Sequence, residues 1–99
     1  MGNEIPFRRG ERIAVRADIR LSAADGRFAE VTLIDISRFG VSVDGLKHLQ
    51  QRALLDLAFP NGGERKGRAV WNEDFLEGIA FEPPLEADEF AVLLRSLQI

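Results

Sequence analysis

Apolar and charged residues alternate along the chain between residues 12 and 21. The apolar set occupies every second position, as Ile13, Val15, Ala17, Ile19 and Leu21. A period of two is typical of a strand with one buried face. Ala24-Asp25-Gly26 follows with residues that tolerate the backbone angles of a tight turn. We therefore expect a hairpin, with a second strand over residues 28–36.

The middle of the chain predicts further short strands. Val41 and Val43 alternate with polar residues, and Asp44-Gly45 ends that third strand. Residues 46–59 fit two structures: Leu46, Leu49, Ala53, Leu54 and Leu57 have helical spacing, whereas Leu55, Leu57 and Phe59 have strand spacing. Periodicity alone favours a helix there. Residues 60–63 then form a strong hairpin motif between that segment and a strand over residues 65–72, which is followed by a return strand over residues 76–82.

The C-terminal residues change character. Pro83-Pro84 breaks the sheet, and one helical face is apolar, with Phe90, Leu93, Leu94 and Leu97. We predict a mainly β fold: a small antiparallel, Greek-key-like β-barrel over residues 12–82, five-stranded from the pattern and six-stranded if residues 52–59 also form a strand, with a short C-terminal helix over residues 86–98. Closure of the barrel removes the exposed edges of a short sheet.

Composition indicates one domain over residues 1–99, because 99 residues with 45% hydrophobic content suit a single core. The net charge of -3 argues against a general nucleic-acid binder, so no DNA partner is expected. Charge is unevenly distributed: residues 1–20 hold five arginines and three acids, which gives +2 and leaves -5 for the remainder. A small, locally bound anion fits that pattern better.

Several kinds of site are excluded. The chain has no cysteine, so it has no disulfide, zinc-thiolate site or cysteine nucleophile, and it suits a reducing cytoplasm. No apolar run approaches the roughly 20 residues that span a membrane, and no secretory signal is evident. We expect a cytoplasmic protein without membrane insertion, and the start at Met1 favours a stand-alone protein.

Two short runs carry the candidate chemistry, Arg8-Arg9-Gly10-Glu11-Arg12 and Asp35-Ile36-Ser37-Arg38-Phe39-Gly40. Arginine forks bind phosphate oxygens or a guanine edge with two hydrogen bonds. Asp, Ser and Gly supply an acceptor, a hydroxyl and close backbone approach. Each run alone has a plainer explanation, either a solvated basic segment or a turn capped by short polar side chains. Together they predict an anion site.

The two runs, followed by Trp71 and Gly78-Ile79-Ala80-Phe81, resemble the PilZ domain, a bacterial receptor module for the second messenger cyclic di-GMP. The resemblance covers almost the whole chain. Arg8 and Arg12 fit its R-x-x-x-R segment, while Asp35, Ser37 and Gly40 fit its D/N-x-S-x-x-G segment. Arg12 and Arg16 also satisfy the first spacing, but Arg16 lies inside the alternating strand, so Arg8 and Arg12 are preferred. The resemblance also implies an irregular turn over residues 46–51 and a strand over residues 52–59, against the helical spacing.

For the site, the resemblance implies that cyclic di-GMP binds to Arg8, Arg9, Arg12, Asp35, Ser37 and Gly40. Arg8 and Arg12 would hold phosphate oxygens and guanine O6/N7 edges, and Arg9 would assist by stacking on a base. Asp35 would accept hydrogen bonds from guanine N1 and N2, and Ser37 would contact a purine edge or a phosphate beside the tight turn at Gly40. Residues 1–11 are expected to be flexible and to become ordered on binding, which would remodel a surface for an unknown effector protein. Ligand stoichiometry stays open, and a monomer or weak dimer is expected.

Two other functions are considered. One is a PilZ-fold adaptor that binds proteins but no nucleotide, and the other is a small nucleic-acid-binding barrel. We assign Trp71 to the core in preference to a base-stacking role. An enzyme is not expected, because Ser37 has no base or oxyanion hole and no P-loop occurs. Neither a cofactor nor a metal site is expected, since the single histidine, His48, has no second ligand at metal spacing.

Overall fold

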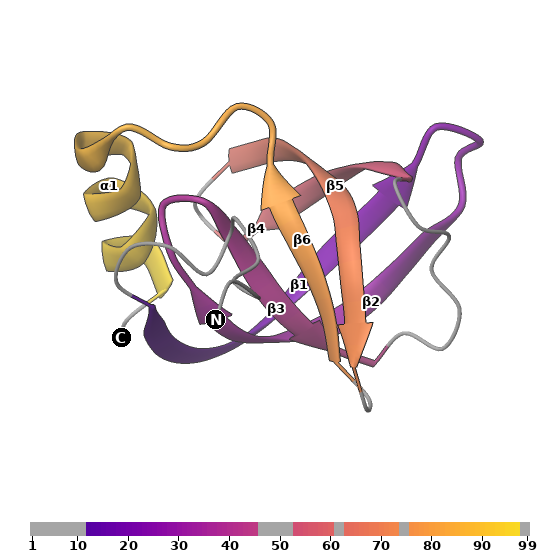
Figure 1. Cartoon of the computed structure of the whole chain (residues 1–99), viewed down its shortest axis with the longest axis horizontal. Coiled ribbons are helices and arrows are strands. Elements are labelled where there is room, and N and C mark those ends of the chain that lie inside the picture. Colours follow the sequence, from indigo (N-terminus) through magenta and orange to yellow (C-terminus); the bar gives the residue numbers. More distant parts are fainter. Residues whose placement is uncertain (1–11, 46–52, 61–62, 74–75, 98–99) are drawn as a thin grey trace, which may run out of the picture.

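Six strands and one helix make up the described part of the chain. The computed structural model describes residues 12–45, 53–60, 63–73 and 76–97. The elements are β1 (Ile13–Ala23), β2 (Phe28–Ile36), β3 (Gly40–Asp44), β4 (Leu54–Phe59), β5 (Gly63–Glu73), β6 (Leu76–Phe81) and α1 (Ala87–Leu97). The strands form a closed barrel in the order β1-β2-β3-β6-β5-β4, and all neighbours are antiparallel (Figure 1). The predicted six-stranded barrel with a C-terminal helix is therefore confirmed.

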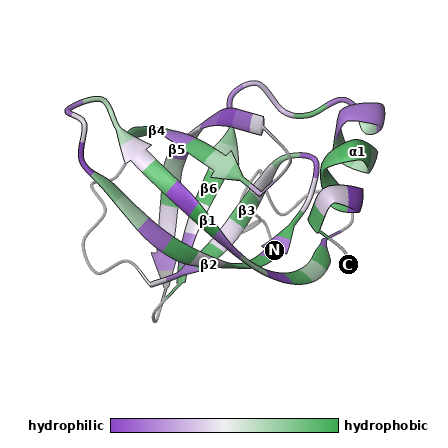
Figure 2. Ribbon diagram, turned by 180° about the vertical axis from the view of Figure 1, so that it is seen from behind, coloured by the Kyte–Doolittle hydropathy of each residue, from purple (hydrophilic) through white to green (hydrophobic). Residues whose placement is uncertain are grey.

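The core fills the inside of the barrel and extends to α1. Hydrophobic and hydrophilic residues alternate along β1 and β2, as the sequence pattern predicts (Figure 2). The most deeply buried apolar side chains are Leu33, Ile36, Val41, Val43, Leu57 and Ile79. Helix α1 lies at one end of the barrel (Figure 1) and contributes the buried Leu93 and Leu97. Each fully buried side chain of this size stabilises the fold by about 1.5 to 3 kcal/mol.

The ambiguous segment before the Pro60 turn is a strand where the structure describes it. Residues 54–59 form β4, as the PilZ resemblance implies and against the helical spacing. The turn expected over residues 46–51 lies outside the described residues. The C-terminal helix begins at Ala87, one residue later than predicted. No helix in the described ranges is long and apolar enough to cross a membrane.

Three bulges interrupt the regular pairing of the strands. They lie between Ala14 and Ala17 in β1, between Leu33 and Asp35 in β2, and between Ala69 and Trp71 in β5. An extra residue in one strand can reverse which face the following side chains occupy, although the burial of β1 still alternates through its bulge. In β2 the bulge lets Leu33 and Ile36 both point into the barrel, although three positions separate them. Asp35 therefore points outwards.

The bulge in β5 has the same effect on Trp71. Strict alternation from the buried Ala69 would turn Trp71 into the core. The bulge instead pairs Trp71 with Gly78, and the neighbouring Ile79 is the residue of β6 that points inwards. The assignment of Trp71 to the core is therefore wrong, and its half-buried side chain lies on the outer face of the barrel.

Candidate ligand site on the outer face of the barrel

A row of paired residues crosses four strands on the outside of the barrel. Asp35 of β2 pairs with Ser42 of β3, Ser42 pairs with Gly78 of β6, and Gly78 pairs with Trp71 of β5. Directly opposed residues of antiparallel strands share a face. The row therefore brings together side chains from both halves of the sequence. We call Asp35, Ser42, Gly78 and Trp71 the outer row.

An ion pair between Arg12 and Asp35 lies at one end of the outer row. Arg12 immediately precedes β1, and Ala14, two residues later, pairs with Asp35. Arg12 Nη2 lies 2.7 Å from Asp35 Oδ2 and 3.5 Å from Ser42 Oγ. The side chains of Arg12 and Asp35 are 31% and 19% exposed, so the pair is only partly solvated. A charge-assisted hydrogen bond of this length is among the stronger polar contacts of a protein.

The second carboxylate oxygen of Asp35 has a different environment. Asp35 Oδ1 is buried, and within the described ranges no donor hydrogen-bonds to it. An ionised carboxylate accepts several hydrogen bonds through its two oxygens. Asp35 therefore holds Arg12 with one oxygen and keeps acceptor capacity on the other.

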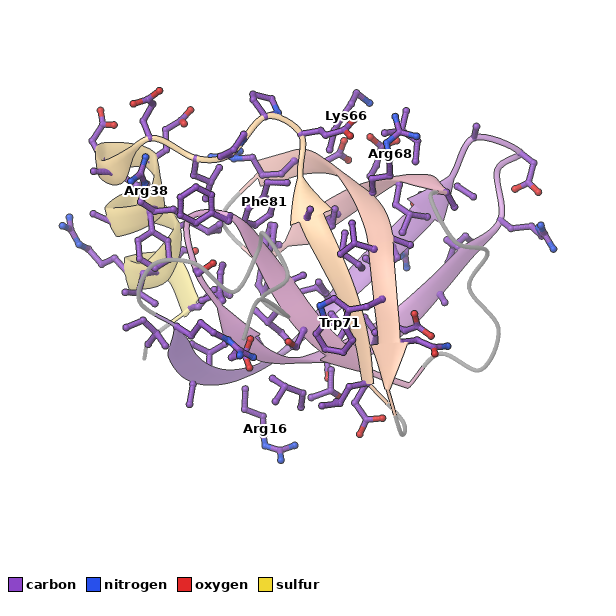
Figure 3. The ribbon with its side chains drawn as sticks, viewed as in Figure 1. Arg16, Arg38, Lys66, Arg68, Trp71 and Phe81 are labelled. Atoms are coloured by element: carbon purple, nitrogen blue, oxygen red, sulfur yellow. The ribbon has the colours of Figure 1, made fainter. Side chains whose placement is uncertain are left out.

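Trp71 forms the opposite end of the outer row. Its indole ring lies against Gly78, in the volume that a Cβ atom on Gly78 would occupy. Figure 3 shows the Trp71 side chain overlying β6. Any side chain at position 78 would collide with the ring, so glycine is required there for steric reasons. Trp71 thus lies at the end of the outer row opposite to Asp35.

Ser37 and Gly40 lie in the turn that joins β2 to β3. The Ser37 side chain is 1% exposed, and its Oγ accepts a hydrogen bond of 3.0 Å from the Phe39 backbone N–H. The Ser37 backbone N–H donates to the Gly40 carbonyl at 2.9 Å. This is the capped turn that short polar residues favour. Ser37 and Gly40 therefore stabilise the backbone conformation of the turn next to Asp35.

The family is settled by comparison with known domains. The model of the PilZ domain family matches residues 6–98. This chain belongs to the PilZ domain family. PilZ domains are cyclic di-GMP-binding or adaptor modules. Comparison with curated proteins gives no match.

The sequence-predicted site of this PilZ domain is only partly assembled from described residues. Arg12 and Asp35 are in direct contact, and Ser37 and Gly40 occupy the adjoining turn. Arg8 and Arg9 lie outside the described residues. The ligand-binding role of all six residues stays a prediction.

Sequence reasoning missed two members of the outer row, Ser42 and Gly78. Ser42 stands between two apolar residues of β3, so alternation alone could have placed it on the outer face. The role of Gly78 depends on Trp71, whose position depends on the β5 bulge. No residue type near that bulge predicts it, because Val70 is common in regular strands.

A buried acid lies directly behind the outer row. Glu77 precedes Gly78 and is 3% exposed. Its Oε2 accepts a 3.3 Å hydrogen bond from Asn72 Nδ2, and Oε1 has no hydrogen-bond donor among the described residues. Burial raises the pKa of the Glu77 carboxyl. Glu77 is not part of a metal site in the described ranges, where no three His, Cys, Asp or Glu side chains gather for one.

Proposed function

We propose that this PilZ domain is a receptor for cyclic di-GMP that regulates an effector protein in motility, biofilm formation or exopolysaccharide synthesis. The observation that carries the proposal is the outer row, with the Arg12–Asp35 pair at one end and Trp71 at the other. Cyclic di-GMP presents phosphates, guanine edges and flat purine faces. The two ends of the row offer a fork, an acceptor and an aromatic face of matching chemistry.

Each end of the row has a specific role in this proposal. Arg12 donates to a phosphate oxygen or to guanine O6 and N7, as arginine does when it reads guanine in DNA. Asp35 accepts from guanine N1 and N2 through its carboxylate oxygens, in exchange for its contact with Arg12. Trp71 stacks on a purine face.

The remaining predicted residues support this arrangement. Ser37 and Gly40 hold the turn that orients Asp35. Arg8 and Arg9 approach the same ligand from residues 1–11, and we propose that this segment becomes ordered on the barrel when phosphates neutralise its arginines. The new surface is then available to the effector protein.

The same geometry also favours a second function, that of a PilZ-fold adaptor without nucleotide. Arg12 and Asp35 already form a short ion pair, and the Ser37 hydroxyl is buried and used by its own turn. A protein-binding module that had the PilZ fold but bound no nucleotide would have the same contacts. The two functions differ in whether cyclic di-GMP binds at all.

Calorimetric titration of cyclic di-GMP into the full chain and into Arg12→Ala distinguishes them. We expect saturable binding that weakens about 10- to 150-fold in the variant, the equivalent of about 1.5 to 3 kcal/mol for a charged hydrogen bond. Arg20→Ala is the control, because Arg20 also forms an ion pair between the chain segments of β1 and β2, with Glu30 at 3.2 Å, and this pair is more exposed. The control should bind within about twofold of wild type.

The other outcomes also discriminate. No heat of binding with folded wild-type protein would overturn the receptor and leave the adaptor. GTP and cyclic di-AMP should compete poorly with cyclic di-GMP. Equal binding of a short single-stranded oligonucleotide, with a steep salt dependence, would instead indicate a nucleic-acid-binding barrel.

A further inference from the structure

The two middle residues of the β2–β3 turn hold the end of β6 and the segment that follows it. The Phe81 N–H donates to the Phe39 carbonyl, and the Leu85 N–H donates to the Arg38 carbonyl, each at 2.8 Å. Arg38 Nε donates back to the Leu85 carbonyl at 3.0 Å. Arg38 therefore binds both main-chain polar groups of Leu85. We call this two-way contact the Arg38–Leu85 clamp.

The Arg38–Leu85 clamp holds the chain just before the start of α1. Pro83 and Pro84 precede Leu85 and have no N–H to donate. The Leu85 side chain is buried, and α1 begins two residues later at Ala87. Figure 3 shows Arg38 beside α1. The clamp thus fixes the chain immediately before the helix.

The Arg38–Leu85 clamp is also connected to Asp35 by a short, buried stretch of chain. Only Ile36 and Ser37 separate Asp35 from Arg38, and both are fully buried. Close-packed residues transmit a displacement because they have no free volume in which to absorb it. The other end of the ion pair leads to α1 as well, since Arg12 directly precedes β1 and β1 contacts α1.

We propose that Arg38 is a positioning residue that couples the ligand site to α1, so that ligand binding changes the packing of the helix. The coupling rests on the proposed function. Cyclic di-GMP would take partners from both Arg12 and Asp35 and would move the two chain segments that lead to α1. The helix is the output element, and it carries an exposed apolar residue, Val92, which is 61% accessible.

Hydrogen exchange of the full chain, measured by mass spectrometry with and without cyclic di-GMP, tests this coupling. Without ligand, Arg38→Ala should raise exchange in α1 about fivefold or more, while the β3 amides stay as protected as in wild type. Arg38→Lys retains a donor for the Leu85 carbonyl and should restore part of the protection. With saturating ligand, α1 exchange should change in wild type and not in Arg38→Ala, whose affinity should stay within about threefold.

Arg27→Ala is the control, because Arg27 pairs with Asp25 in the β1–β2 turn at the far end of the barrel (Figure 1). It should leave the α1 response intact. Unchanged α1 exchange in ligand-saturated wild type, or a full response in Arg38→Ala, would overturn the coupling. If calorimetry shows no binding to wild type, the proposed function and the ligand response fail together. Equal α1 exchange in ligand-free wild type and Arg38→Ala would overturn the role of the Arg38 side chain in holding α1, whatever the ligand result.

Discussion

The Trp71 indole rests on the backbone of Gly78, in space that is open only because residue 78 has no side chain. Gly78→Ala should therefore displace the ring and destabilise the fold by about 1 to 3 kcal/mol, as overpacking typically does. Trp71 is the single tryptophan, so its fluorescence reports the change directly. We expect a red-shifted emission maximum and a lower midpoint in urea. An unchanged spectrum would mean that the ring does not depend on Gly78.

Trp71 itself should affect ligand affinity if cyclic di-GMP binds at the outer row. Stacking of a base on an aromatic side chain contributes about 1 to 3 kcal/mol, so Trp71→Ala should weaken binding about 5- to 150-fold. Trp71→Phe preserves a ring and should retain most of the affinity. Calorimetry on both variants, after urea unfolding has shown that they are folded, provides the measurement. Equal affinities for wild type and Trp71→Ala would remove Trp71 from the site.

Leu54 and Leu57 distinguish a strand from a helix in β4. On a helix these residues, three positions apart, would share a face. In the structure Leu57 is fully buried, whereas Leu54 is 43% exposed. Leu57→Ala should cost about 2 to 5 kcal/mol of unfolding free energy, and Leu54→Ala less than about 1 kcal/mol. Urea unfolding of the two variants measures the difference, and similar costs would contradict the strand.

Glu77 should make stability depend on pH. Its pKa is raised by burial, so the folded state binds the proton more tightly than the unfolded state does. Stability should therefore fall as the pH rises from the ordinary glutamate pKa through the raised pKa of the folded state. Glu77→Gln removes the buried charge and keeps an acceptor for Asn72. The variant should melt at a higher temperature than wild type at pH 7.5, and the difference should shrink towards pH 4.

A melting difference that is the same at both pH values would show that Glu77 ionisation does not oppose folding. Asp56→Asn is a suitable control. Asp56 pairs with Lys66 at 2.6 Å on the barrel exterior, where both side chains are well solvated. That substitution should have only a small effect on stability at either pH.

Much of the fold follows from local patterns. The alternation from Ile13 to Leu21 predicts β1, and the Asp25-Gly26 turn predicts the return strand. The segment 54–59 is harder, because its leucines satisfy both periods and only tertiary pairing with β1 and β5 decides between them. Here the PilZ resemblance predicts the strand that periodicity does not.

The candidate site is less predictable, since it depends on where strands gain an extra residue. Asp35 and Trp71 face outwards because of bulges near Ile34 and Val70. Ile34 and Val70 are both common in regular strands, so no local sequence feature predicts that the inward and outward positions are exchanged there. The motif spacing predicts which residues matter, but pairing across four strands determines which of them share a surface.

The Arg12–Asp35 pair gives the ligand-free site its own counter-ion. Under the proposed function, this ion pair would disfavour the binding of abundant phosphate compounds that carry no N–H donor. Inorganic phosphate attracts Arg12 but has no N–H group to replace the arginine at Asp35, so it would leave a partly buried carboxylate without compensation. Cyclic di-GMP brings phosphates and guanine N–H donors on one molecule. Discrimination would then come from the requirement that both members of the pair exchange partners together.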